Sequence, residues 1–351
     1  MSELKIGYKA SAEQFSPRAL LEYGVLAEEA GFDSVLISDH FQPWRYTDGH
    51  SPFSIAWLAA LGERTRRVTL GTSVITPTFR LHPSVVAHAF ATLGCLYPDR
   101  VLLGIGTGES LNEVSSIGVQ WPDSKERFAR MKEAIELMRR LWQEEFVTFE
   151  GTYYKTVNAT LYDRPSSRIP IYVAATGESA ARLAGRTADG FICTSGKARD
   201  LYTQTLLPAV ADGAKKAGRD AAKIEKLIEM KVSFDMDRER ALNDCAYWAA
   251  LALSAEEKVG VEDPREMERR AAALPIEKAA SRWIVSDDPE EHVERIAEYV
   301  RLGFIHLVFH FPGPDQRRSI ELYRDEIIPR LRRLPRCVEP RPRRAEIDRK
   351  G

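Results

Sequence analysis

The sequence predicts an α/β fold, a (β/α)8 TIM barrel with inserted segments, from three observations. Short apolar runs alternate with stretches of helical periodicity, which is typical of repeated βα units. The apolar runs are nearly continuous, as expected for parallel strands that are buried on both faces. The chain has 351 residues, a length that one barrel of this kind reaches when it carries insertions.

The expected strands are short and are followed by loops rich in small and polar residues. Their number matches that of the barrel. In chain order they cover residues 4–8, 34–38, 68–74, 101–105, 171–174, 190–194, 227–232 and 306–310.

Helices are expected between the strands from their end signals and from apolar spacing. Ser16 followed by Pro17 is a typical N-cap and first helical residue, and Gly31 stands where a helix-terminating glycine belongs. Apolar residues at spacings of three and four predict two more amphipathic helices. The first carries Phe128, Met131, Ile135, Met138 and Trp142, and the second carries Ile320, Tyr323, Ile327, Leu331 and Leu334.

Two stretches depart from the βα rhythm. Residues 235–281 are too long for one βα connection, and we interpret them as an insertion with helical pieces around 241–253 and 264–273. The barrel with this insertion is expected to occupy residues 1–334 as a single domain. The tail, residues 335–351, is rich in Pro and Arg; we expect a disordered, solvated extension, and contact with an anion is the alternative.

Composition and charge exclude several classes of function. Lys plus Arg number 50 against 51 for Asp plus Glu, whereas proteins that bind nucleic acids or membrane surfaces need a basic excess, so neither partner is expected. Cys95, Cys193, Cys245 and Cys337 form no CxxC pair, and no His lies at metal-ligand spacing, so neither disulfide nor metal site is expected. No signal peptide or apolar run of about 18 residues is evident, which predicts a soluble, cytoplasmic protein.

Small, charged and hydroxyl residues gather directly after the expected strands, where a barrel of this type carries its active site. Polar positions of this kind are the candidates for catalysis and binding. After the second to sixth strands they include Asp39, His40 and Trp44; Ser73, Val74 and Thr76; Gly104, Gly106, Thr107, Gly108, Glu109 and Asn112; Thr176 and Gly177; and Thr194 and Lys197.

Each of these features also has a plain structural interpretation. The three glycines at and just after the end of the fourth strand allow a ligand to approach closely, but they lack the dinucleotide GxGxxG spacing, so a tight turn is the alternative. The Asp-His pair after the second strand is equally typical of a helix cap beside a surface histidine. Glu109 is also explained as a first-turn acid favoured by the helix dipole, and Lys197 as a solvated loop residue.

Longer blocks of sequence resemble one enzyme family. The blocks are KIGYKASAEQF, SDHFQPW, GTSVITPTFR, GCLYP, GIGTGESLNE and DGFICTSGK, with RWIV and HLVFH late in the chain. They are similar to the deazaflavin-dependent glucose-6-phosphate dehydrogenases of the luciferase-like superfamily. The resemblance extends from about residue 3 to about residue 334.

The resemblance implies coenzyme F420 as the cofactor, a sugar 6-phosphate as the substrate and a homodimer as the assembly. It implies the catalytic pair His40 and Glu109, with Trp44 lining the sugar site. The implied sugar-phosphate ligands are Thr194, Lys197, Lys258 and Arg282. The implied coenzyme contacts are Asp39, Thr76, Thr107, Gly108 and Asn112, a phosphate cradle of Thr176, Gly177, Ser179 and Ala180, and a cis peptide bond between Ser73 and Val74 that supports the ring.

These residue types suit the oxidation of a hemiacetal carbon, which gives up a hydride while its hydroxyl gives up a proton. A His can take that proton and a carboxyl group can supply one to the ring; which of His40 and Glu109 is the base stays open. Two Lys and one Arg suit a doubly charged phosphate.

Two departures from the family pattern concern the substrate and the coenzyme phosphate. Val259 stands where the glucose-6-phosphate enzymes carry a His that faces the sugar, and the fifth loop has Ala-Thr-Gly where the family often has a second Gly. The expected reaction is hydride transfer from C1 of glucose 6-phosphate, or of a related hexose 6-phosphate, to oxidised F420, which yields the 6-phospho-lactone. The alternatives are another F420- or FMN-dependent luciferase-like oxidoreductase, and a non-catalytic flavin- or sugar-phosphate-binding barrel.

Overall fold

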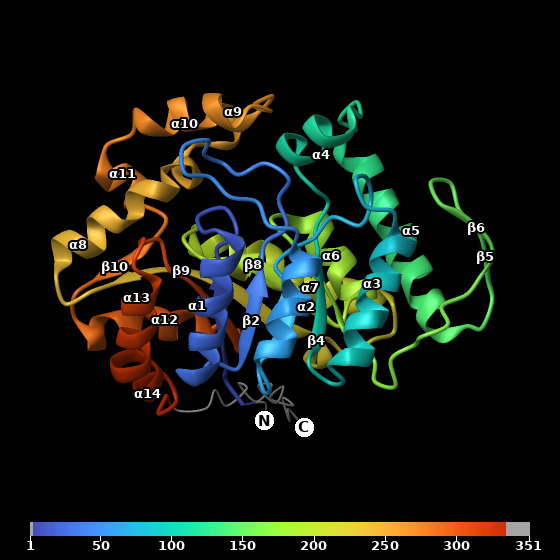
Figure 1. Cartoon of the computed structure of the whole chain (residues 1–351), viewed down its shortest axis with the longest axis horizontal. Helices are drawn as coiled ribbons and strands as arrows, with labels where there is room; N and C mark the ends of the chain where they lie inside the picture. The colour runs from blue at the N-terminus through green and yellow to red at the C-terminus, as the bar shows by residue number, and fades with distance from the viewer. Residues whose placement is uncertain (1–2, 335–351) are drawn as a thin grey trace, which may run out of the picture.

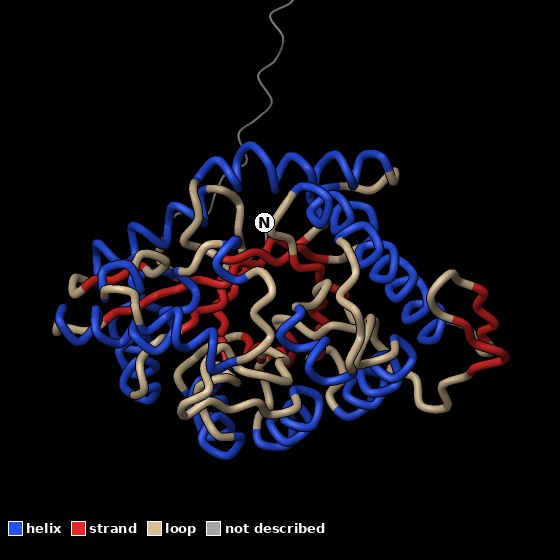
Figure 2. The backbone as a smooth tube through the Cα atoms, turned by 90° about the horizontal axis from the view of Figure 1, so that it is seen from above, coloured by secondary structure: helices blue, strands red, loops and turns tan. Residues whose placement is uncertain are grey.

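A closed barrel of parallel strands forms the centre of the structure, and helices surround it (Figures 1 and 2). The computed structural model describes residues 3–334, apart from the side chain of Ala255; the predicted tail, with Cys337, lies outside the described residues. The barrel strands are β1 (Lys5–Ala10), β2 (Ser34–Ile37), β3 (Thr69–Thr72), β4 (Val101–Ile105), β7 (Ile171–Ala174), β8 (Gly190–Thr194), β9 (Glu225–Phe234) and β11 (His306–His310). The pairing of β8 with β9 and of β11 with β1 closes the ring.

All eight expected strands are confirmed, each within two residues of its expected ends. Their continuous apolar character follows from burial on two sides. Val35 and Ile37 of β2 pack outward into the main core under the helices, whereas Leu36 belongs to a separate cluster inside the barrel. The other buried members of that interior cluster are Leu102, Tyr172, Ile192, Leu227 and Val308. Each large side chain buried there contributes roughly 1.5–3 kcal/mol to folding.

The helices begin and end largely where their signals predict. Ser16 caps α1, accepting a hydrogen bond from the amide of Ala19, and Gly31 after its end has a φ of +88°. The helix bounds are α1 (Pro17–Glu29), α2 (Ser54–Arg64), α3 (Pro83–Leu96), α4 (Ser110–Ile117), α5 (Ser124–Gln143), α6 (Glu178–Thr187), η1 (Leu201–Leu206), α7 (Leu207–Lys216), η2 (Ala221–Lys223), α12 (Pro289–Arg301), α13 (Gln316–Leu322), η4 (Tyr323–Ile327) and α14 (Ile328–Leu331). Both predicted apolar stripes face the core, on α5 and on α13 to α14, the latter with a π-helical turn at η4. No helix in the described part of the chain is long and apolar enough to span a membrane.

Three strands were not predicted from the sequence. β5 (Val147–Glu150) and β6 (Lys155–Ala159) form an antiparallel hairpin outside the barrel, and β10 (Ile284–Ser286) pairs with the end of β9. The hairpin strands are short and partly charged, and only alternate residues of β5 are buried, so they lack the continuous apolar run of a barrel strand. β10 has three residues, which is too short to stand out from its neighbours.

Between β9 and β10 the chain forms a set of short helices at one end of the barrel (Figure 1). They are α8 (Arg238–Asn243), η3 (Asp244–Ala252), α9 (Ala255–Lys258), α10 (Pro264–Ala272) and α11 (Ile276–Ala280). Both expected helical pieces are present, as α8 with η3 and as α10. These helices share a small apolar core that includes Met267 and Val261, and Trp44 from the loop after β2 packs against it.

Candidate active site

The predicted site residues cluster at the carboxyl ends of the barrel strands. His40 follows β2, Ser73 to Thr76 follow β3, Glu109 follows β4 at the start of α4, and Thr194 ends β8. Lys258 ends α9, and Arg282 lies between α11 and β10, so the chain between β9 and β10 supplies two of the predicted phosphate ligands.

His40 forms an ion pair with Glu13, a buried carboxylate just after β1. His40 Nδ1 lies 2.5 Å from Glu13 Oε1, and the Ser38 hydroxyl donates to Glu13 Oε2 at 2.9 Å. Burial opposes the charge on Glu13, but the attraction of His40 and Lys9 outweighs it and lowers the Glu13 pKa to about 2. Burial likewise lowers the pKa of His40, but the Glu13 carboxylate outweighs it and raises that pKa to about 9. Glu13 therefore fixes the ring and makes His40 a stronger base.

Trp44 connects the two predicted catalytic residues with a predicted phosphate ligand. Its ring nitrogen donates to Glu109 Oε2 at 3.1 Å, and its ring lies parallel to that of His40 with centroids 6.5 Å apart. The Lys258 ammonium lies 4.8 Å from the centroid of the Trp44 ring, which is a cation–π contact. Four predicted residues therefore form one cluster.

Three cations converge beside this cluster and repel one another. Burial and then Arg282 lower the pKa of Lys258 to about 8, against the attraction of Glu109. Burial and Arg282 also lower the pKa of Lys197. The Arg282 guanidinium donates to the carbonyl oxygens of Leu251 and Ser195, both at 3.3 Å. Like charges held this close are stabilised by an anion, so the three side chains suit a phosphate.

The loops after β3 and β4 form a second part of the site, on the side assigned to the coenzyme. The Ser73–Val74 peptide bond is cis, as the resemblance implies, and the buried Lys9 ammonium donates to the carbonyl oxygen of Ser73. Gly108 has a φ of +82°, and a Cβ there would lie 3.0 Å from the Thr76 methyl group, so these two predicted residues are neighbours. Such close approach of the backbone leaves room for a flat ligand.

Asp39 and Asn112 are buried and order the loop that carries His40. Asp39 accepts from the amide and the hydroxyl of Ser54 at 3.2 and 2.7 Å, and it pairs with Arg80. Asn112 Oδ1 accepts from the amides of Phe41 and Gln42 at 2.7 and 3.0 Å. These side-chain oxygens are engaged within the protein, so the two residues shape the site through the loop.

The amino terminus of α6 is open to an anion. Gly177 precedes the helix and provides no side-chain cap, so the first amides of α6 have no intrahelical acceptor. A Cβ at Gly177 would meet no atom within 4 Å, and Thr176 and Ser179 are exposed beside it, whereas Ala180 is buried. Free amides and the helix dipole suit a phosphate at this position.

The sequence did not single out several buried charges beneath the site. Lys9 pairs with Glu229 at 3.0 Å, and Glu229 also pairs with Lys231 at 2.9 Å. Burial alone would raise the pKa of Glu229, but the two lysines hold it well below its usual range. A signal existed, because Glu229 and Lys231 are charges at alternate positions within the apolar part of β9, residues 227–232, and so point to the same side of the strand, into the barrel.

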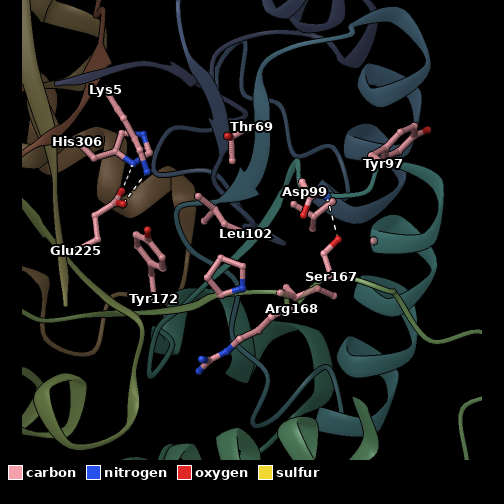
Figure 3. A pocket seen from close by; sticks show the side chains of 14 residues that line it. Lys5, Thr69, Tyr97, Asp99, Leu102, Ser167, Arg168, Tyr172, Glu225 and His306 are labelled. Carbon is pink, nitrogen blue, oxygen red and sulfur yellow. Dashed lines mark hydrogen bonds and ion pairs between the residues drawn. The ribbon is translucent and has the colours of Figure 1, made fainter. Parts of the chain in front are cut away.

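A hollow of about 220 Å³ at the opposite, amino-terminal end of the strands contains none of the predicted residues (Figure 3). There, Lys5 and His306 both contact Glu225, at 2.6 and 2.9 Å, and His306 Nε2 lies 2.8 Å from the Ser34 hydroxyl. Because these polar groups bind one another, we interpret the hollow as part of the packing that stabilises the amino-terminal end of the barrel.

The family model of the luciferase-like monooxygenases matches residues 3–306. The chain belongs to the luciferase-like family. Within this family it is 63% identical over 331 residues to a protein of Nakamurella multipartita named F420-dependent glucose-6-phosphate dehydrogenase, with 94% of this chain and 97% of the relative covered. A protein of Mycolicibacterium smegmatis with the same name is 57% identical over 335 residues, covering 95% of this chain and all of the relative.

Solved structures of luciferase-like proteins agree with the fold. An F420-dependent secondary alcohol dehydrogenase in complex with an F420-acetone adduct superposes with a TM-score of 0.89 and 32% identity, over 94% of this chain and 99% of the other. An F420-dependent tetrahydromethanopterin reductase from Methanopyrus kandleri gives a TM-score of 0.78 at 22% identity, over 94% of this chain and all of the other, and supports the fold alone.

Proposed function

We propose that the protein transfers a hydride from C1 of a sugar 6-phosphate, glucose 6-phosphate or a related hexose 6-phosphate, to oxidised coenzyme F420, giving the 6-phospho-lactone. The observation that carries this proposal is the contact chain from His40 through Trp44 to Glu109 and Lys258. It joins a proton acceptor and a carboxylate to a group of three cations, as the oxidation of a phosphorylated sugar requires. The names of the relatives at 57–63% identity support the same reaction.

The residues present fit the coenzyme. The cis peptide at Ser73–Val74 and the close backbone at Gly108 suit a flat ring, and the uncapped start of α6 at Gly177 suits a phosphate. Thr107 directly precedes Gly108 on the loop after β4. When bound, F420 supplies the acceptor for the hydride.

In this proposal His40 acts as the base that accepts the proton of the C1 hydroxyl. Glu109 is the carboxyl group that would supply a proton to the coenzyme ring. As the C1–H bond breaks with its electron pair, the C1 hydroxyl becomes a carbonyl and its proton goes to His40 Nε2. Glu13 holds Nδ1 on the other side of the ring and stabilises the imidazolium that results. Thr194, Lys197, Lys258 and Arg282 hold the phosphate, and Trp44 lines the sugar.

The pH dependence tests the pairing of His40 with Glu13. The active form of a base is deprotonated, so kcat/KM should rise with pH until it levels off near the His40 pKa of about 9. Glu13→Gln removes the charge that raises this pKa, so the rising limb of the pH profile of kcat/KM should move to lower pH by more than about one unit. Ser38→Ala, which removes only a hydroxyl bonded to Glu13, should shift it much less. A limb that stays in place in Glu13→Gln would exclude His40 as the titrating base.

Val259 should make the enzyme less selective among hexose 6-phosphates. Val259 is 77% exposed next to Lys258, so it is not packed under the inserted helices, and it offers no hydrogen bond to a sugar hydroxyl. An apolar wall discriminates weakly, so epimeric hexose 6-phosphates should be used within about one or two decades of the best substrate in kcat/KM. Val259→His should narrow that range. Strict selectivity for glucose 6-phosphate, unchanged in the variant, would contradict this expectation.

We also infer that the protein works as a homodimer in the cytoplasm, with no nucleic-acid partner. The resemblance supports the dimer, and the near-zero net charge of −1 supports the absence of a polyanion partner. Light scattering coupled to size exclusion would measure the assembly directly, and a monomer at working concentration would refute the dimer.

An isotope label tests the reaction itself. With glucose 6-phosphate deuterated at C1, the reduced coenzyme should gain one deuterium, and the sugar product should lose it. Reduction of F420 without deuterium transfer would show that the hydride comes from elsewhere.

A further inference from the structure

The carboxylate of Glu268, on the inserted helix α10, binds the loop that carries Trp44. Its Oε2 accepts hydrogen bonds from the amide and the hydroxyl of Thr47 at 3.0 and 3.2 Å, and its Oε1 lies 3.2 Å from Arg45 Nε. Burial raises the pKa of Glu268, but the contacts from Thr47 and Arg45 outweigh it and lower that pKa below its usual value. A single side chain thus holds both residues of the loop by charge-assisted bonds.

The loop makes a tight turn that depends on outside partners. Asp48 has a φ of +53°, in the left-handed region, and its carbonyl oxygen accepts from the Tyr247 hydroxyl at 3.2 Å. The Arg45 guanidinium lies 4.9 Å from the centroid of the Tyr247 ring. Tyr247 belongs to η3, so both groups that hold the turn come from the chain between β9 and β10.

Apolar packing fixes the position of Trp44 only in part, because its ring borders a hollow. Trp44, Arg45, Tyr247 and Glu268 line a hollow of about 230 Å³. The rest of its lining is dominated by short side chains, among them Ala246, Ala249, Ala250, Ala271, Ala272 and Ala279. Trp44 packs against the apolar core of the inserted helices but also borders this hollow, so the polar contacts of its neighbours Arg45 and Thr47 help to fix its position.

We propose that Glu268 is a positioning residue for the sugar site, which fixes Trp44 through Arg45 and Thr47. The inference rests on the proposed function, because Trp44 is assigned there to the sugar. Trp44 contacts Glu109 at 3.1 Å and Lys258 at 4.8 Å, so a shift of the loop disturbs both the sugar end and the phosphate end of the substrate. The loops after β3 and β4 and the start of α6, which face the coenzyme, make no part of this contact.

Glu268→Ala should therefore raise KM for glucose 6-phosphate by about tenfold, the lower range for loss of a hydrogen bond to a charged group. kcat should change less, and the dissociation constant of F420 should stay within about twofold. Calorimetric titration of the F420-free protein with glucose 6-phosphate should give the same tenfold loss of affinity without relying on turnover. Glu268→Gln keeps an acceptor for Thr47 but loses the charge that pairs with Arg45, so its effect should be intermediate.

Glu266→Ala is the matched control. Glu266 lies on the same helix and is also ionised, but it pairs with Arg269 and Arg270 at 2.7 and 2.6 Å rather than with the loop. Its substitution should lower the melting temperature about as much as Glu268→Ala and leave KM unchanged.

Equal KM values in Glu268→Ala and Glu266→Ala would overturn the role of Glu268, as would a loss of F420 affinity as large as the loss of sugar affinity. Should Glu268→Ala fail to fold, Glu268→Gln and Arg45→Ala decide the question by the same comparison. A wild-type protein without turnover would overturn the proposed function itself, whereas an active wild type with unaltered variants overturns only this inference.

Discussion

His40→Ala should lower kcat by a factor of about 100 to 10,000, the usual contribution of a general acid–base group. Its ring lies parallel to that of Trp44 and its Nδ1 is paired with Glu13, which leaves Nε2 to accept the proton. Affinity for F420 should change little. The measurement is steady-state reduction of F420 at saturating sugar phosphate.

Glu109→Gln should lower kcat by a factor in the same range, because an amide keeps the hydrogen bond from Trp44 but cannot exchange a proton. His88→Ala, at an exposed position of α3, controls for the loss of a histidine and should be neutral. Near-normal turnover in a variant that lacks both His40 and Glu109 would remove the pair from the mechanism.

Loss of a phosphate ligand should raise KM for the phosphorylated sugar by roughly 10- to 100-fold, since a hydrogen bond to a charged group contributes about 1.5–3 kcal/mol. This applies to Lys197→Ala, Lys258→Ala and Arg282→Ala; burial and then the charge of Arg282 lower the pKa of both lysines. The weak use of the unphosphorylated sugar should hardly change. Lys215→Ala, at an exposed site on α7, is the matched control.

The comparison of the two sugars separates binding from folding. If a variant loses the same factor with glucose as with glucose 6-phosphate, the replaced cation supports the fold or the coenzyme and does not bind the phosphate. Arg282 is the most informative of the three, because its bonds to Leu251 and Ser195 also give it a structural role.

The barrel was predictable because burial on two faces gives each of its strands a nearly continuous apolar run. β4 and β11 match their expected bounds, and the residues after the strands converge because parallel strands end at one side of the ring. The hairpin β5–β6 escaped prediction because β5 is buried on one face only and β6 is mostly exposed, so neither strand carries such a run.

The partners of the predicted residues were harder to find than the residues themselves. Glu13 lies 27 residues before His40, and its backbone is held by Tyr247, 234 residues further on. Glu268 reaches Thr47 across 221 residues. Such contacts depend on how the inserted helices dock on the barrel, which no local pattern of residue types encodes. Motifs therefore identified the groups that we propose to contact the ligands, whereas the residues that orient these groups became visible only in the fold.

The most direct test of the proposed reaction is the absorbance of the deazaflavin band when a panel of sugars is added to the protein with oxidised F420. We expect the band to bleach with hexose 6-phosphates, glucose 6-phosphate among the best of them, and hardly at all with the unphosphorylated sugars. A protein that copurifies with FMN, and leaves the F420 band unchanged with every sugar phosphate, would contradict the account.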